Sequence, residues 1–119
     1  MNKIIIASHG ELALGMKNTV EFFGGSGVEY VEQTLTDTGF ENRVIEILTK
    51  NKDDNCVVFT DLYGGSVNQC FFKNLNDFNF HLVTGMNLAV ILECVLASVE
   101  ISLSLIGTLL KCQKVNFAI

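Results

Sequence analysis

Three polar segments of this 119-residue chain hold the side chains best suited to catalysis, and each follows an apolar run. Residues 8–10 are Ser-His-Gly, residues 61–66 are Asp-Leu-Tyr-Gly-Gly-Ser, and residues 85–87 are Gly-Met-Asn. A neutral imidazole attacks only through the ring nitrogen without a proton, and a carboxylate that binds the other nitrogen leaves the first one free to react. We therefore predict that His9 is a nucleophile and that Asp61 orients its ring.

A glycine pair and a serine follow Asp61 and provide a candidate cradle for a phosphoryl group. Gly64, Gly65 and Ser66 open a predicted helix, whose first N–H groups attract anions. Glycine allows the backbone to approach closely, and the serine hydroxyl can donate a hydrogen bond or cap the helix. Such a site would act mainly by positioning and electrostatics. Residues expected at the rim of the site are Ser8, Gly10, Thr60, Tyr63, Met86 and Asn87.

Each of these residues also has a purely structural interpretation. His9 alone can be a solvated loop residue, and Asp61 alone can be a turn or helix-cap residue. The pair Gly64 and Gly65 can be a tight turn and nothing more. The residue types alone leave these alternatives open.

Alternating strand and helix patterns predict where the three segments lie. Short β-branched runs typical of buried strands alternate with segments whose apolar residues recur at helical spacing. The predicted strands are residues 3–8, 28–34, 56–60 and 80–84, and the predicted helices are residues 11–23, 41–50, 67–75, 88–97 and 100–111. This order predicts an α/β fold with a doubly wound, mostly parallel sheet and helices on both faces. The first and third strands are neighbours in most such folds, and ligands bind beyond the carboxyl ends of the strands, so His9 and Asp61 should meet.

The tail is predicted to add a fifth strand, because residues 114–119 alternate in polarity. Such a terminal strand can pair with its own sheet or with a sister chain.

Length, net charge and cysteine content exclude several classes of protein. The length predicts one domain over residues 1–119, and a net charge of −5 argues against a nucleic-acid partner. The four cysteines are expected to be buried thiols in a reducing cytosol rather than a disulfide or zinc site. We expect no signal peptide and no membrane span, and the chain lacks the phosphate-loop, dinucleotide and serine-hydrolase glycine motifs.

Three segments of the sequence resemble a known family. They are Ile-Ile-Ala-Ser-His-Gly at residues 5–10, Phe-Thr-Asp-Leu-Tyr-Gly-Gly-Ser at residues 59–66 and Thr-Gly-Met-Asn-Leu at residues 84–88. In order and spacing, residues 1–98 resemble the enzyme IIA component of the mannose-type (mannose/fructose/sorbose) sugar phosphotransferase system.

The resemblance implies a cytoplasmic phosphocarrier. His9 would be phosphorylated on its outer ring nitrogen, Asp61 would hold the other nitrogen, and Ser66 with nearby backbone amides would bind the phosphoryl oxygens. The donor would be the phosphocarrier protein HPr, and the acceptor would be a separate IIB protein that serves a membrane permease. No metal, nucleotide or other cofactor would be required. The family sheet has the strand order 2-1-3-4-5, with an antiparallel last strand that is exchanged within a homodimer.

Two other functions are open to such a chain. One is the phosphocarrier subunit of a dihydroxyacetone kinase, which shares the fold and the early histidine. The other is a receiver-like regulatory module in which Asp61 takes the phosphoryl group. Receiver modules usually have an acidic pair after the first strand, whereas only Glu11 follows here.

Overall fold

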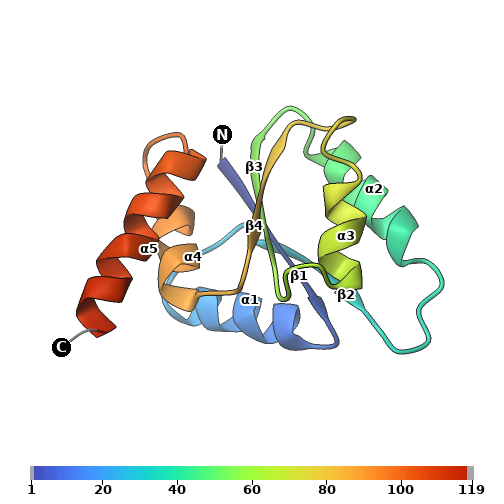
Figure 1. Cartoon of the computed structure of the whole chain (residues 1–119), viewed down its shortest axis with the longest axis horizontal. Coiled ribbons are helices and arrows are strands. Elements are labelled where there is room, and N and C mark those ends of the chain that lie inside the picture. The colour runs from blue at the N-terminus through green and yellow to red at the C-terminus, as the bar shows by residue number, and fades with distance from the viewer. Residues whose placement is uncertain (1, 118–119) are drawn as a thin grey trace.

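One sheet of four strands carries helices on both of its faces (Figure 1). The computed structural model describes residues 2–117 of the protein, and their side chains through residue 110. The strands are β1 (Asn2–His9), β2 (Glu29–Gln33), β3 (Asn55–Thr60) and β4 (Phe80–Thr84). The helices are α1 (Leu12–Phe22), α2 (Phe40–Lys50), α3 (Ser66–Phe72), α4 (Leu88–Val95) and α5 (Leu103–Phe117).

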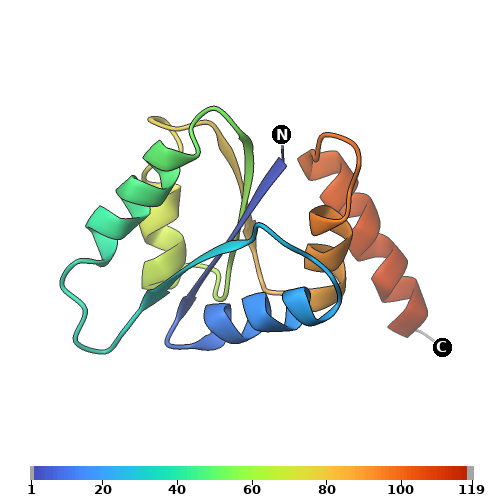
Figure 2. The same cartoon turned by 180° about the vertical axis from the view of Figure 1, so that it is seen from behind.

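All strand pairs of the described sheet are parallel, in the order β2-β1-β3-β4. Figure 2 shows the same strands from behind. Ala7 pairs with Thr60 across β1 and β3, and His9 pairs with Gln33 across β1 and β2. The predicted doubly wound α/β fold is therefore confirmed. The carboxyl ends of β1, β2 and β3 share one edge, so the segments that follow them are neighbours.

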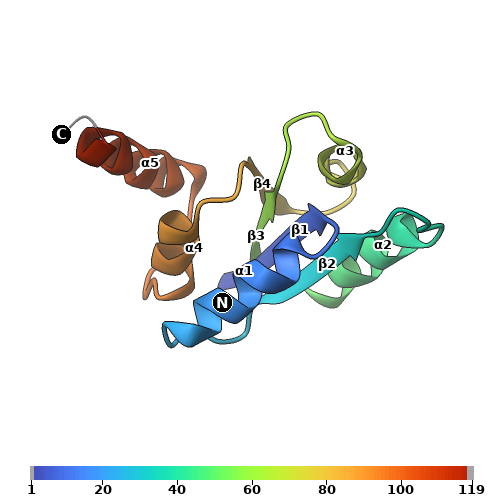
Figure 3. The ribbon, with the colours of Figure 1, turned by 90° about the horizontal axis from the view of Figure 1, so that it is seen from below.

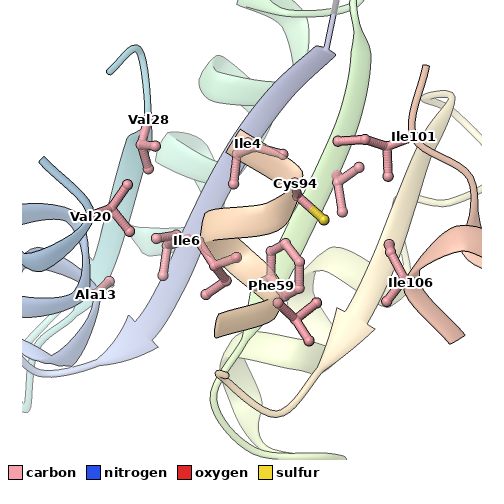
Figure 4. Packing of buried hydrophobic residues seen from close by; sticks show 12 residues of the cluster. Ile4, Ile6, Ala13, Val20, Val28, Phe59, Cys94, Ile101 and Ile106 are labelled. Carbon is pink, nitrogen blue, oxygen red and sulfur yellow. The ribbon is translucent and has the colours of Figure 1, made fainter. Parts of the chain in front are cut away.

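The alternating side chains of β1 divide the core into two halves. Ile4 and Ile6 pack with α1, α4 and α5, as Figure 4 shows, whereas Ile5 and Ala7 pack with α2 and α3. This alternation is the two-residue period of a strand covered on both faces. Each fully buried aliphatic side chain stabilises the fold by about 1.5–3 kcal/mol. The strands that carry the site are thus anchored from both sides.

Helix α5 lies beyond α4 at one end of the molecule (Figure 3). Buried Ile106 attaches it to the half of the core that contains α4, and the Ser102 hydroxyl caps its start by accepting the N–H of Leu105 at 3.1 Å. None of the helices in the described part of the chain is long and apolar enough to cross a membrane.

The predicted fifth strand is wrong for the residues that the structure describes. Residues 114–117 are the last turn of α5 rather than an antiparallel strand, and residues 118–119 lie outside the described part. The chain has no proline, and no glycine follows Gly107, so nothing in the sequence interrupts the helix. The alternation in polarity was too short to decide between the two structures.

The predicted burial of the cysteine thiols is confirmed for three residues. Cys56, Cys70 and Cys94 are buried free thiols, and the side chain of Cys112 is outside the described part. Burial raises the pKa of Cys56 and of Cys94 to about 11, so both stay protonated near neutral pH.

Candidate active site

His9 and Asp61 meet at the carboxyl edge of the sheet, 52 positions apart in sequence. His9 is the last residue of β1, and Asp61 directly follows β3. One carboxylate oxygen of Asp61, Oδ2, lies 2.9 Å from His9 Nδ1 and accepts the backbone N–H of His9, also at 2.9 Å. The other oxygen accepts the N–H of Leu62 at 3.0 Å. The expected juxtaposition of ring and carboxylate is therefore present.

The carboxylate of Asp61 is held in its ionised form. Burial acts to raise its pKa, but hydrogen bonds from the backbone and side chain of His9 outweigh burial, so the pKa lies below its ordinary value of 3.8. An ionised carboxylate only accepts hydrogen bonds, so His9 Nδ1 carries a proton. The ring is thereby oriented with Nε2 outward, and 40% of the His9 side chain is exposed against 9% of Asp61.

Ser66 faces the outer nitrogen of the ring. Its Oγ lies 3.0 Å from His9 Nε2, and it is the first residue of α3. A hydroxyl at this distance can donate to a group bound on Nε2 once the group displaces the direct contact.

The glycine pair shapes the loop between Asp61 and Ser66. Gly64 has a φ of +75°, a left-handed conformation that side chains rarely adopt. A Cβ on Gly65 would lie 3.2 Å from His9 Cε1 and 3.3 Å from Leu62 Cβ, so a larger residue would press on the ring. Gln69 Nε2 donates to the Gly64 carbonyl at 2.7 Å and holds the loop from α3.

Two residues expected at the rim lie beneath the site instead of lining it. Ser8 and Thr60 are fully buried. The Ser8 hydroxyl accepts the N–H of Ala13 at 2.7 Å and so stabilises the first turn of α1. The Thr60 hydroxyl donates to Asn68 Oδ1 at 2.8 Å, which ties β3 to α3.

The other four rim candidates are spread more widely. Tyr63 is 89% exposed in the loop beside Asp61, and the N–H of Gly10 donates to the Gln33 carbonyl at 2.8 Å. Met86 packs against the core, and Asn87 caps α4 by accepting an N–H of its first turn at 3.1 Å.

Gln33 is a neighbour of the site that sequence reasoning missed. It is the last residue of β2, and its side-chain oxygen accepts the Ser66 hydroxyl at 2.5 Å. The available signal was its position, a polar residue at the carboxyl end of the strand beside His9. An open groove of about 510 Å³ continues from His9 past Gln33 to Leu35.

Exposed apolar side chains lie on the segments around His9. They are Leu12 at the start of α1, Leu35 after β2, and Leu62 and Tyr63 after Asp61. A group of exposed apolar side chains close to one reactive group is typical of a protein docking surface. Among the described side chains, no group of three or more His, Cys, Asp or Glu residues could hold a metal ion.

Fold and site together define a doubly wound α/β protein with a histidine–carboxylate pair at the carboxyl edge of its sheet. Comparison with known families matches residues 3–107 to the family described as PTS system fructose IIA component. The chain therefore belongs to the mannose-type IIA family of the sugar phosphotransferase system (PTS), a family of phosphotransferase components.

Solved structures include similar proteins of this class. The mannose/sorbose-specific IIA subunit of Enterococcus faecalis superimposes with a TM-score of 0.83 at 23% identity, over 92% of this chain and 87% of that one. The phosphotransferase system component EIIA of Streptococcus agalactiae gives a TM-score of 0.75 at 25% identity, over 93% and 91% of the two chains. The comparison with curated proteins found no match.

Proposed function

We propose that this protein is a phosphoryl carrier that accepts a phosphoryl group on His9 Nε2 from phosphorylated HPr and passes it to a IIB protein. The observation that carries the proposal is the position of the His9 ring. Asp61 holds Nδ1 at 2.9 Å, while Nε2 points outward beside a serine hydroxyl.

The chemistry follows from the proton on Nδ1. With that proton directed to Asp61, the lone pair of Nε2 is free to attack the phosphorus of the donor's phosphohistidine. A bond from Nε2 to phosphorus forms, the donor's N–P bond breaks, and its electron pair returns to the donor nitrogen. The phosphorylated ring keeps its Nδ1 proton and a positive charge, which the Asp61 carboxylate stabilises. Transfer to the acceptor repeats the exchange, and it requires no metal or cofactor.

Ser66 is proposed to bind the transferred group. Its hydroxyl would donate to a phosphoryl oxygen, and the backbone N–H groups of Gly64 and of the first turn of α3 would add further donors. The N–H of Gly65 already donates to the Leu62 carbonyl at 3.2 Å, so Gly65 would contribute through its close approach to the ring. We expect Ser66→Ala to slow phosphorylation of the protein by roughly tenfold to a hundredfold, the usual cost of one donor to a developing charge. Ser26→Ala, in an exposed loop, is the matched control. Rapid-quench measurement of the transfer rate checks the prediction, and an unchanged rate in Ser66→Ala would contradict it.

Donor and acceptor are both proteins in this proposal, and they use the same nitrogen in turn. The exposed Leu12, Leu35, Leu62 and Tyr63 side chains would supply the shared docking surface. The exchange would take place in the cytoplasm, and the IIB protein would deliver the group to sugar entering through a membrane permease. The permease would determine which sugar is carried.

We also propose that the protein is a homodimer. β4 is an edge strand of the sheet, and no fifth strand covers it among residues 2–117. An open edge is a ready partner for a second chain. Sedimentation of the full chain is expected to give twice the mass of the 13.1 kDa monomer, and a species of monomer mass would contradict this.

The test of function is incubation with phosphoenolpyruvate, enzyme I and HPr. The protein should gain one phosphoryl group that survives alkali and is lost in acid, as phosphohistidine does. No labelling would refute the proposal, and an alkali-labile label would assign the group to a carboxylate such as Asp61.

A further inference from the structure

Strand pairing places Gln33 directly beside His9. The two residues are register partners across β1 and β2, and the Gln33 carbonyl accepts the N–H of Gly10 at 2.8 Å. The backbone of Gln33 is therefore held by the sheet, and its half-buried side chain reaches Ser66 Oγ at 2.5 Å. Ser66 thus has two polar neighbours, the carboxamide of Gln33 and the ring of His9.

The single proton of the Ser66 hydroxyl can serve only one of these two neighbours at a time. The Ser66 hydroxyl has one proton, which it donates to Gln33 Oε1. That proton is therefore not directed at His9 Nε2, which lies 3.0 Å from the same oxygen. Because Nδ1 donates to Asp61, Nε2 is the nitrogen beside which the Ser66 hydroxyl must act during transfer.

Phosphoryl transfer needs a different arrangement of the same three residues. After transfer, the Ser66 hydroxyl must turn from Gln33 toward a phosphoryl oxygen bound on Nε2. Its proton is then no longer available to Gln33. A carboxamide can adapt by rotating its terminal bond, which presents NH₂ instead of oxygen to Ser66 Oγ. A carboxylate lacks that donor, and an apolar side chain lacks both groups.

We infer that Gln33 is a positioning residue that changes the direction of the Ser66 hydroxyl. Its carboxamide accepts the Ser66 proton before transfer and donates to Ser66 Oγ afterwards, which leaves the hydroxyl free to bind the phosphoryl group. The inference rests on the proposed function, because it assumes that His9 carries the group. It adds a third side chain to the two that hold the ring.

The equilibrium of phosphoryl exchange with HPr tests this role. We expect Gln33→Met to shift the equilibrium constant toward phosphorylated HPr by roughly threefold to tenfold, the value of one hydrogen bond in a charged network. Gln33→Glu should shift it further, because its carboxylate only accepts hydrogen bonds and adds a negative charge beside the phosphoryl group. Asn76→Met and Asn76→Glu are the matched controls, since Asn76 is exposed in the turn before β4, at the opposite edge of the sheet.

A double-mutant cycle with Ser66→Ala isolates the mechanism. Because Gln33 acts through the hydroxyl, Gln33→Met should change the equilibrium constant by less than about twofold once Ser66 is alanine. An effect of Gln33→Met that persists there would overturn the inference. So would equal changes in the forward and reverse rates at an unchanged constant, which would identify Gln33 as a docking contact only. Failure of the wild-type protein to accept a phosphoryl group would instead refute the proposed function.

Discussion

His9→Ala is expected to accept no phosphoryl group from HPr while keeping its fold. The substitution removes Nε2, and no other described side chain occupies the position between Asp61 and Ser66. His9 ends β1 and its side chain is 40% exposed, so we expect the free energy of unfolding to change by less than about 1 kcal/mol. Mass spectrometry after incubation with phosphoenolpyruvate, enzyme I and HPr measures the result, and circular dichroism verifies the fold.

His81→Ala is the matched control, because the chain has only two histidines. His81 lies within β4, and its register partner across the sheet is Val57 rather than a residue of the site. This variant should therefore gain one phosphoryl group, like the wild type. Labelling of His9→Ala at the wild-type level would refute the assignment of His9 as the phosphorylated residue. If that label were lost in alkali, a carboxylate would be the phosphorylated group.

The pair His9 and Asp61 was predictable because its geometry depends mainly on topology. A residue that ends a parallel strand lies at the carboxyl edge whatever the details of packing, and adjacent strands bring their ends together. The apolar runs of β1 and β3 are strong signals of buried strands, so their predicted boundaries differ from the observed ones by at most one residue at each end. An error of this size changes the residue at which a strand is predicted to end. It does not change the edge of the sheet at which the following residue lies.

The roles of Ser8, Thr60 and Gln33 were not predictable in the same way. Successive side chains of a strand point to opposite faces, so a residue beside the site can turn toward the core instead. Ser8 and Thr60 do so, and both satisfy buried polar groups. Gln33 reaches Ser66 only because α3 begins at that serine. Contacts of this kind depend on the positions of side chains within about an ångström, which residue types do not specify.

Asp61→Asn is expected to slow phosphoryl transfer by a factor of about 10² to 10⁴, the usual range for loss of a group that holds a catalytic proton. Asparagine keeps the shape of the side chain but has one acceptor oxygen and one NH₂ group. In the wild type, one oxygen serves His9 Nδ1 and the His9 backbone N–H, and the other serves Leu62. Either orientation of asparagine therefore brings two N–H donors face to face. The charge that stabilises the phosphorylated ring is also lost.

The pH dependence of stability provides a second, independent measurement on the same variant. The pKa of Asp61 is lower in the folded protein than in the unfolded chain. The ionised carboxylate therefore stabilises the folded state at pH values above the pKa that Asp61 has in the unfolded chain. That contribution is lost as the pH falls through the lower pKa of the folded state. Asparagine does not titrate here. The difference in free energy of unfolding between wild type and Asp61→Asn should therefore be largest near neutral pH and shrink in acid, as denaturant titrations can measure.

The two measurements separate the catalytic role of Asp61 from a structural one. If Asp61 only tied β3 to β1, Asp61→Asn would lose stability but transfer phosphoryl groups at the wild-type rate whenever it is folded. We expect instead that Asp61→Asn loses mainly transfer rate and little of its fold. Its circular dichroism should be unchanged at neutral pH, and rapid-quench experiments should show a large loss of rate. A folded variant with the wild-type rate would show that the carboxylate does not orient the ring. The outward position of His9 Nε2 would then need another cause, and of the described neighbours only Ser66 contacts that nitrogen.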